Sequence, residues 1–356
     1  MAYYPTMNVC DCGRFRATLG LSYRLVNETW GFDLGERYHL DPFYRVDTLM
    51  QIDRAVFERF GDLGIGSDDP KPRPSVEPFG HRFLPAMFGC ECAYAADTEP
   101  WAKLRFYTDD EILALDDWTW ERFESASPLR VTVDQANLLR AKYGPFNSMP
   151  DLGSVINTGI YLMGDDLFVA YLDRPHIVRK LYENITQLRL MCMEYFPRLD
   201  GRPVSQLHIG NCCVAMISPN GYMSCNLESD RRIVSFCQDR GIELTMHQDS
   251  DVTPHLEHYA AMDYIRTFDF GMDTDFEKLA DMCPEASVNS IWFPQWLMTH
   301  TVDEVRDEVL RQMDSGRRFS RFSFSIHGID NLTGDDRVRA LYNTFKEAAL
   351  EICDRQ

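Results

Sequence analysis

The sequence lacks several features that would assign it to a specialised class of protein. No apolar run approaches the roughly 18 residues that a membrane-spanning helix needs. Basic residues are too few to balance the acidic ones, because 36 Lys and Arg stand against 55 Asp and Glu and leave a net charge of -19. Sequence-independent binding to nucleic acid relies on Lys and Arg that neutralise phosphates, so this composition argues against it. Internal repeats and low-complexity segments are also absent, which leaves a globular chain with no expected membrane or nucleic-acid partner.

The first residues, 1–5, are short and uncharged and do not resemble a signal peptide, so we expect a cytoplasmic protein. Its 11 cysteines are then expected to be free thiols rather than a disulfide framework. Two C-x-C pairs, Cys10 with Cys12 and Cys90 with Cys92, are spaced more closely than the sulfurs of ordinary zinc knuckles. No break in composition divides the 356 residues, and we expect one domain over 1–356.

Strand-like and helix-like segments alternate through the second half of the chain, which is typical of a parallel α/β fold. Ser218 and Pro219 fit the start of a helix that continues to Gly241, and Thr301 with Glu304 fits a capping box. The expected strands are 204–209, 242–246, 264–270, 286–293 and 321–326, and the last helix is expected at 336–353.

This pattern gives about five β/α units, and further units in the first half would bring the number to the eight of a (β/α)8 TIM barrel. The segment around 155–161 is a candidate for one of them, and residues 1–100 are expected to form an irregular N-terminal cap with the first barrel elements. Active sites of such barrels lie at the carboxyl ends of the strands. His208, His247 and His327 each fall at such an end.

The run from Gly241 to His258 is the most informative stretch for function. A strand-like segment stops at His247, and Asp249 and Asp251 follow within four residues. A second segment of the same design alternates apolar residues before it breaks at His327. Imidazole and carboxylate groups at strand ends suit a metal site or an acid/base site, so we expect His247 and His327 to share one site.

Several phrases of the chain resemble the uroporphyrinogen decarboxylase superfamily, which includes cobalamin-linked, zinc-dependent methyltransferases. They occur in the family's order, cover most of the chain, and include GRFRATLG, FLPAMFGCECAYAADTEPWAK, INTGIYLMGDDLFVAYLDRP, HIGNCCVAMISPNGY and SIHGIDNLTGDDRVRALYNTF. The resemblance implies a uroporphyrinogen decarboxylase-like (β/α)8 barrel with its site in the mouth. It also implies a small-molecule substrate, a corrinoid protein as partner, and the homodimer that this family often forms.

Departures from the family pattern separate its branches. The arginine-rich segment with which the decarboxylases grip substrate carboxylates is replaced here by LSYRLVNETWGF. The methyltransferase branch holds zinc with a His-x-Cys pair and a distant Cys, and this chain offers His247, Asp249 and His327 at the matching places. The resemblance therefore implies a two-histidine, one-carboxylate site for a divalent metal. Zinc is the first expectation, and the harder ligands leave iron or manganese as alternatives.

Four further residues match positions that are catalytic or line the cavity in the family, and each has an ordinary alternative. Asp68 and Asp69 match the strand end of the decarboxylase's catalytic carboxylate, yet they also fit a turn before Pro70. Cys213 is a candidate thiol or a small buried residue, and Tyr161 is a candidate catalyst or part of the cavity wall.

The leading hypothesis is a metal-dependent methyl or one-carbon transferase that acts on a small substrate in the barrel mouth. A decarboxylase or lyase that uses Asp68 or Asp69 with His327 is the alternative, and a barrel that only binds its ligand is the third. Aromatic residues at Trp292, Phe293 and Trp296 could line an apolar pocket or belong to the core.

Overall fold

The computed structural model describes residues 7–11 and 15–354, while the side chains at 7–11, 15–17, 19, 327 and 352–354 lie outside the description. Its main sheet has seven strands in the order β1-β2-β9-β8-β7-β6-β5. Their bounds are β1 (Met7–Asp11), β2 (Phe15–Leu21), β5 (Gln206–Gly210), β6 (Glu243–Gln248), β7 (Thr267–Gly271), β8 (Ser287–Trp292) and β9 (Arg321–Ile329).

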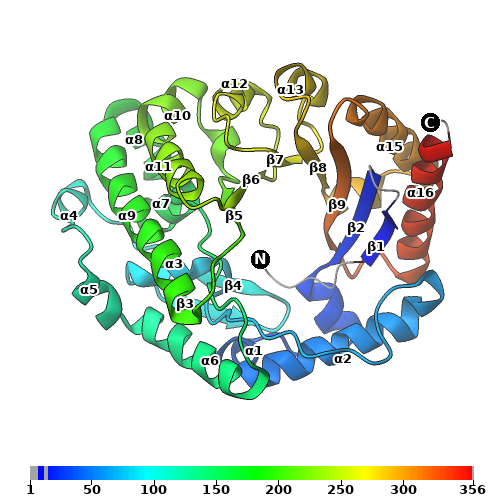
Figure 1. Ribbon diagram of the computed structural model, residues 1–356, viewed down its shortest axis with the longest axis horizontal. Coiled ribbons are helices and arrows are strands. Elements are labelled where there is room, and N and C mark those ends of the chain that lie inside the picture. The colour runs from blue at the N-terminus through cyan, green and yellow to red at the C-terminus, as the bar shows by residue number, and fades with distance from the viewer. Residues whose placement is uncertain (1–6, 12–14, 355–356) are drawn as a thin grey trace.

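The sheet is parallel from β2 through β9 to β5, and β1 pairs antiparallel at the outer edge of β2. Figure 1 shows these strands curving around the middle of the molecule with helices outside them. Six parallel strands are joined where the expected barrel has eight. Within the described ranges the ladder stays open between its edge strands β5 and β1, so a closed barrel is not shown there.

Helices make up most of the rest of the described chain. In chain order they are α1 (Glu36–Leu40), α2 (Pro42–Phe60), α3 (Phe83–Met87), α4 (Asp109–Leu113), α5 (Trp120–Ser125), α6 (Ser127–Tyr143), α7 (Val155–Met163), α8 (Asp166–Asp173), α9 (Pro175–Asp200), α10 (Pro219–Cys225), α11 (Leu227–Gln238), α12 (Leu256–Ala260), α13 (Phe276–Met282), α14 (Pro294–Thr299), α15 (Val302–Gly316) and α16 (Asp335–Asp354). Shorter turns are η1 (Leu25–Thr29), η2 (Gly61–Leu63), η3 (Gly80–Arg82), η4 (Val214–Met216) and η5 (Thr253–His255). No helix among these residues has the length and apolarity to cross a membrane.

The expected second-half elements are confirmed with shifted ends. Ser218 caps α10 and accepts from the Gly221 amide, but the predicted helix to Gly241 breaks at Asn226 into α10 and α11. Thr301 and Glu304 form the predicted capping box of α15. Strand β9 continues to Ile329, so the backbone of His327 lies inside the strand and not just beyond its end.

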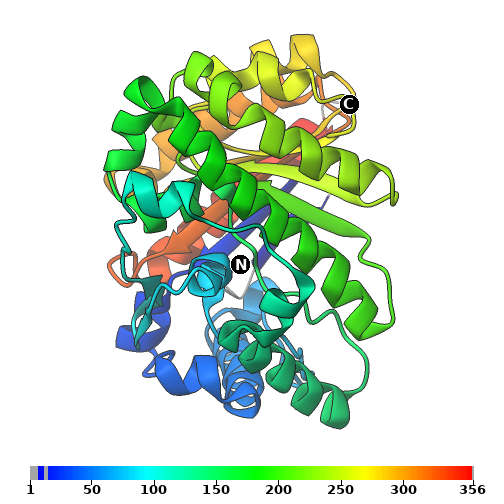
Figure 2. The ribbon, with the colours of Figure 1, turned by 90° about the vertical axis from the view of Figure 1, so that its left-hand side faces the viewer.

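On the open side of the ring, where the described strands of the main sheet do not pair, helices, loops and a hairpin take the place of the ladder. The segment expected to hold a β/α unit near 155–161 is entirely helical, as α7. The hairpin of β3 (Cys92–Ala95) and β4 (Thr98–Ala102) lies in this half of the chain, and α9 runs across the outside of the ring (Figure 2). Buried Arg189 of α9 donates to the carbonyl of Gly153 and, at 2.5 Å, to the carbonyl of His208 in β5. One guanidinium therefore joins the loop before α7 to the edge strand β5.

The two faces of the sheet differ in chemistry. The outward face packs on helices, as Phe322 on Phe276 of α13 and Phe324 on Phe345 of α16 show, with ring centroids 5.4 and 5.8 Å apart. Most of the described inward positions carry polar side chains that are only partly buried, and buried Ile291 of β8 is an exception. One register level on this inner face pairs His247, Asp269, Asn289 and Ser323 on four neighbouring strands. Branched apolar residues usually fill a barrel interior, so this polar face is the feature that positions a site.

Candidate metal and catalytic site

His247 near the end of β6 is the centre of the site. Its Nδ1 lies 2.6 Å from Oδ2 of Asp269 in β7, and its Nε2 lies 3.0 Å from Oδ1 of Asp249 in the following loop. Both ring nitrogens therefore face carboxylates, and the ring is held from two sides. The strand-end histidine that the sequence singled out does lie among acidic groups.

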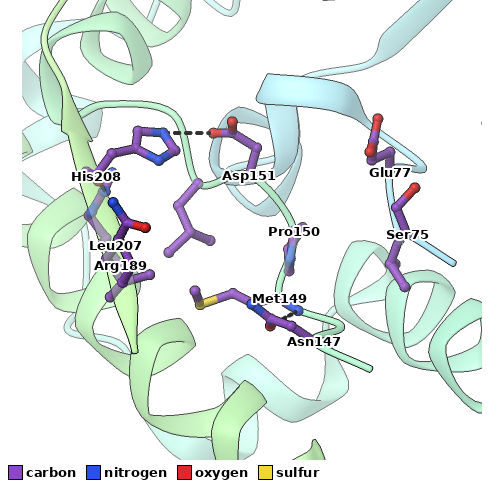
Figure 3. A pocket seen from close by; sticks show the side chains of 12 residues that line it. Ser75, Glu77, Asn147, Met149, Pro150, Asp151, Arg189, Leu207 and His208 are labelled. Carbon is purple, nitrogen blue, oxygen red and sulfur yellow. Dashed lines mark hydrogen bonds and ion pairs between the residues drawn. The ribbon is translucent and has the colours of Figure 1, made fainter. Parts of the chain in front are cut away.

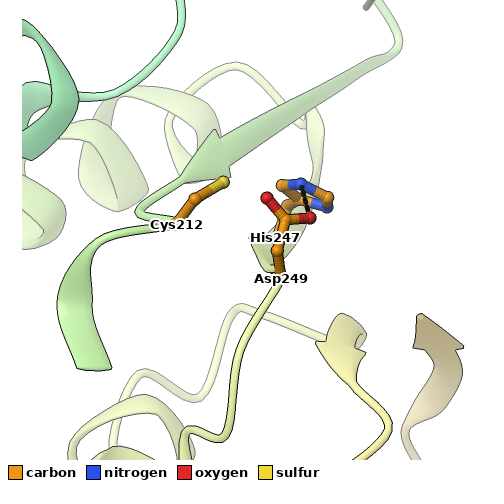
Figure 4. A group of neighbouring side chains, drawn as sticks. All are labelled: Cys212, His247 and Asp249. Carbon is orange, nitrogen blue, oxygen red and sulfur yellow. Dashed lines mark ion pairs between the residues drawn. The ribbon is translucent and has the colours of Figure 1, made fainter. Parts of the chain in front are cut away.

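Cys212 completes a group of three potential metal ligands. One ligand atom from each of Cys212, His247 and Asp249 lies within 4.8 Å of the others. Figure 4 shows the thiol, the imidazole and the carboxylate converging from the loop after β5 and from the end of β6. Sulfur, nitrogen and oxygen donors at such spacing fit a divalent ion such as zinc. Asp269 on the remote nitrogen of His247 adds the carboxylate that commonly orients a metal-binding imidazole.

The loop that carries Cys212 is fixed from behind by buried polar groups. The Asn211 amide donates to the carbonyl of His247 at 3.0 Å, and its side chain donates to Asp230 at 2.9 Å. Tyr222 also donates to Asp230, at 2.5 Å. Burial raises the pKa of Asp230 to about 6, although both donors oppose that rise. This network holds the thiol-bearing loop against β6.

Neighbouring charges and hydrogen bonds shift the pKa values of His247 and Cys212. Burial lowers the pKa of His247, but its hydrogen bonds to Asp249, Asp269 and Cys212 outweigh that effect and raise the pKa well above its usual value. Burial raises the pKa of Cys212, and the bond to His247 opposes that rise. A protonated His247 then carries a positive charge that these carboxylates stabilise. A metal ion bound at Nε2 would replace the proton on that nitrogen.

His327, the second predicted histidine ligand, has its backbone in β9, but its side chain lies outside the described residues. Its predicted role as a ligand stays a prediction. Cys212, the residue before the predicted Cys213, was not predicted as a metal ligand. Asp269 was missed, although a charged residue inside the apolar strand Thr267–Gly271 is a signal for an inward-facing functional group.

A second polar group lies on the open side of the ring. His81 of η3 places Nδ1 2.9 Å from Asp151 and Nε2 3.2 Å from Glu99 of β4. The other oxygen of Asp151 lies 3.7 Å from Nε2 of His208. Figure 3 shows Asp151 facing His208 at a cavity of about 220 Å³ between β5 and the segments 75–77 and 147–152. The His208 and His247 rings are 6.4 Å apart, so this group adjoins the site.

The histidines and carboxylates of this second group shift one another's pKa values. Burial lowers the pKa of His81, but Asp151 and Glu99 overcome that effect and raise it to about 9. Burial would raise the pKa of Asp151, whose side chain is 5% exposed, yet His208 and His81 hold it well below its usual value. An imidazolium between two carboxylates therefore links η3, β4 and the loop before α7.

The predicted catalytic residues fall in different surroundings. Asp68 and Asp69 lie in an exposed turn, where the 78% exposed Asp69 pairs with Lys71. This placement agrees with the turn before Pro70 and gives no support to a catalytic carboxylate. Their catalytic role is a prediction without structural support.

Cys213 and Tyr161 are half-buried near the site. Burial, with Cys212 and Asp249 nearby, raises the pKa of Cys213 to about 11, so its thiol stays protonated near neutral pH. Tyr161 lies in α7 with the Arg82 guanidinium 5.1 Å above its ring, and burial raises the pKa of its hydroxyl. These surroundings suit a cavity wall, and the catalytic roles of both residues stay predictions.

Comparison with known proteins gives a structural likeness and no sequence family. No family model matches the chain, and no curated protein matches it. The chain resembles the solved structure of a methyltransferase from Methanosarcina mazei with a TM-score of 0.63 and 14% identity, over 98% of this chain and 94% of that one. The chain shares its fold with that methyltransferase. A second match is the catalytic domain of a β-amylase from Paenibacillus polymyxa, with 11% identity and a TM-score of 0.23. It covers 85% of this chain and 68% of the amylase chain.

Proposed function

We propose that the chain is a metal-dependent methyl or other one-carbon transferase that acts on a small polar substrate at the carboxyl ends of β5, β6 and β7. The observation that carries the proposal is the convergence of Cys212, His247 and Asp249, with Asp269 behind the imidazole. The fold shared with a methyltransferase supports the reaction class. The resemblance of the sequence to cobalamin-linked methyltransferases suggests a corrinoid protein as the methyl carrier.

In this proposal the three residues divide the work of holding a cation. Neutral His247 would bind the ion through Nε2 while its Nδ1–H donates to Asp269. The negative charges of the Cys212 thiolate and the Asp249 carboxylate would balance the two positive charges of the ion. A divalent ion held there would lower the pKa of a bound substrate thiol, hydroxyl or water. The substrate atom loses its proton to solvent and forms a bond to the methyl carbon, and the bond from that carbon to its carrier breaks with its electron pair left on the carrier.

The side chains around the site favour a polar substrate. Trp292, one of the aromatic residues expected either in a pocket or in the core, is 0% exposed and packs edge to face on Phe324 and Phe345. It is therefore part of the core behind the sheet. The inner face next to the site instead presents hydroxyl, amide and imidazole groups from neighbouring strands.

Metal analysis tests the proposal directly. Protein purified without added metal is expected to carry close to one equivalent of a divalent ion, and His247→Ala and Cys212→Ser are expected to lose it. Exposed His176 on α9 provides the matched control, and His176→Ala should keep the metal. His327→Ala in the same series shows whether that side chain is a fourth ligand. Wild-type protein that holds no metal, even after incubation with zinc, would contradict the proposal.

Activity is tested with methylcobalamin as donor and a panel of small thiols and alcohols as acceptors. Loaded wild-type protein is expected to consume methylcobalamin and form the methylated acceptor, detected by mass spectrometry, and His247→Ala is expected to fall to the background rate. Methyl transfer that survives removal of the metal by a chelator would contradict metal dependence, and chelator-resistant release of carbon dioxide or another cleavage product from a substrate would favour the decarboxylase and lyase alternative. A ligand that binds and is recovered unchanged would favour a binding protein.

A further inference from the structure

A row of hydrogen-bonded side chains crosses the inner face of the sheet at one register level. It begins at Ser323 in β9, continues through Asn289 in β8 and Asp269 in β7, and ends at His247 in β6. Parallel pairing places these four residues opposite one another on successive strands. The metal-binding proposal uses only the last two residues of this row, so the first two need an explanation of their own.

The row has a single chemical direction. A carboxylate can only accept, so the side-chain nitrogen of Asn289 must face Asp269 Oδ1, and the amide oxygen must face Ser323. The Ser323 hydroxyl lies 2.9 Å from that amide oxygen and can donate to it. With Oδ1 of Asp269 engaged by Asn289, Oδ2 is left for Nδ1–H of His247 at 2.6 Å. Neutral His247 is then left with its lone pair on Nε2, which faces Asp249 and belongs to the cluster with Cys212.

The level below provides a comparison within the same sheet. Two residues earlier on three of the row's four strands, Thr245 of β6 pairs with Thr267 of β7, and Thr267 pairs with Ser287 of β8. Among the described residues no hydrogen bond joins the side chains of Thr267 and Ser287. A polar residue at an inward position therefore does not by itself produce such a row, and the row occurs at the level of the candidate metal ligands.

We propose that Ser323, Asn289 and Asp269 are positioning residues that select the Nδ1–H form of His247 and thereby set the affinity of the Cys212, His247 and Asp249 site for a divalent cation. This inference rests on the metal site of the proposed function. Asn289 is the residue that decides it, because its amide fixes which oxygen of Asp269 meets the imidazole. Outer partners of metal ligands typically change metal affinity by about 10- to 100-fold when they are removed.

Zinc affinity, measured by competition with a chromophoric chelator, tests the row. Asp269→Ala is expected to weaken binding about 100-fold and Asn289→Ala about 10-fold. Ser323→Ala should weaken it less, and Ser323→Thr, which keeps the hydroxyl, should restore wild-type affinity. Ser287→Ala and Thr267→Val, at the level below, are the matched controls and should bind zinc as the wild type does.

The tautomer itself is observed by nitrogen NMR of zinc-loaded protein labelled with ¹⁵N-histidine. The His247 signals, identified by their loss in His247→Ala, are expected to show a protonated Nδ1 and a zinc-bound Nε2. In Asp269→Ala the exchange protection of that Nδ1 proton should disappear. This readout distinguishes positioning from a general loss of packing, and the mild Ser323→Ala variant keeps the test valid if Asn289→Ala does not fold.

The outcomes separate the two proposals. Wild-type affinity in folded Asn289→Ala and Ser323→Ala, or zinc bound through Nδ1, would overturn the positioning role and leave the metal site intact. Failure of the wild type to bind any divalent ion would overturn both.

Discussion

The two sides of the ring hold their polar groups by different means. On the ladder side, backbone pairing of β6 to β9 sets His247, Asp269, Asn289 and Ser323 side by side. On the open side, Asp151 brings together loops, η3 and β5 through ion pairs and hydrogen bonds. In the first case the backbone decides which side chains meet. In the second the side chains decide how the backbone segments meet, so their removal should cost more stability.

The largest loss is expected from Arg189→Met. Arg189 is 3% exposed and donates to the carbonyls of Gly153 and His208, which lose these donors when it is removed. The unpaired acceptors should lower the free energy of unfolding by about 3–5 kcal/mol, measured by urea denaturation.

The control for this variant lies on the same helix. Arg198 has a side chain that is 70% exposed and pairs with Glu194 one turn earlier. Arg198→Ala should change stability by no more than about 0.5 kcal/mol. Equal effects of the two arginine variants would mean that Arg189 does not join the open side of the ring.

A pH-dependent loss is expected from the group around His81. Glu99 and Asp151 raise its pKa to about 9, above the usual 6.5, so the imidazolium stabilises the fold fully below pH 6.5. That contribution should disappear as pH rises through about 9. From the size of the shift it amounts to roughly 3 kcal/mol.

Comparison of wild-type protein with His81→Gln isolates this effect, since other groups titrate equally in both. Urea denaturation at several values between pH 6 and 10 should show the wild-type advantage shrinking toward zero. Asp151→Asn should reduce the same pH dependence without abolishing it, because it takes away one of the two carboxylates that contact His81 and leaves Glu99. An advantage that is constant across this range would show that His81 does not hold a proton in the folded protein.

The smallest loss is expected on the ladder side, from Thr301→Ala. The Thr301 side chain accepts from the Glu304 amide, and Glu304 accepts from the Thr301 amide at 2.7 Å. Loss of this cap should cost about 1 kcal/mol, and Thr301→Ser should keep it. Thermal unfolding measures both. A loss as large as that of Arg189→Met would remove the contrast between the two sides.

The same contrast explains what the sequence could predict. Period-two alternation and capping residues predicted β5 to β9, α15 and the placement of His247 at a strand end. Asp269 and Asn289 act through cross-strand register, which a single strand does not reveal, and Cys212 enters through the turn that Asn211 fixes.

The open side was harder to predict because no periodic signal encodes it. His81, Glu99 and Asp151 lie far apart in the chain and meet only after helices and loops have packed. The region near 155–161 was expected to contribute a β/α unit, yet only a helix is formed there, and the join to β5 depends on Arg189, a charged residue inside a long amphipathic helix.

The polar inner face has a consequence for how this protein could be altered. Thr245, Thr267 and Ser287 line the middle of the ring without being fully buried, while the apolar packing lies between the sheet and the outer helices. These three side chains are only partly buried and lie outside the apolar core, so they should contribute less to folding than the core residues do. New charges or larger polar groups could therefore be introduced at these three positions while the apolar core between the sheet and the outer helices is left unchanged.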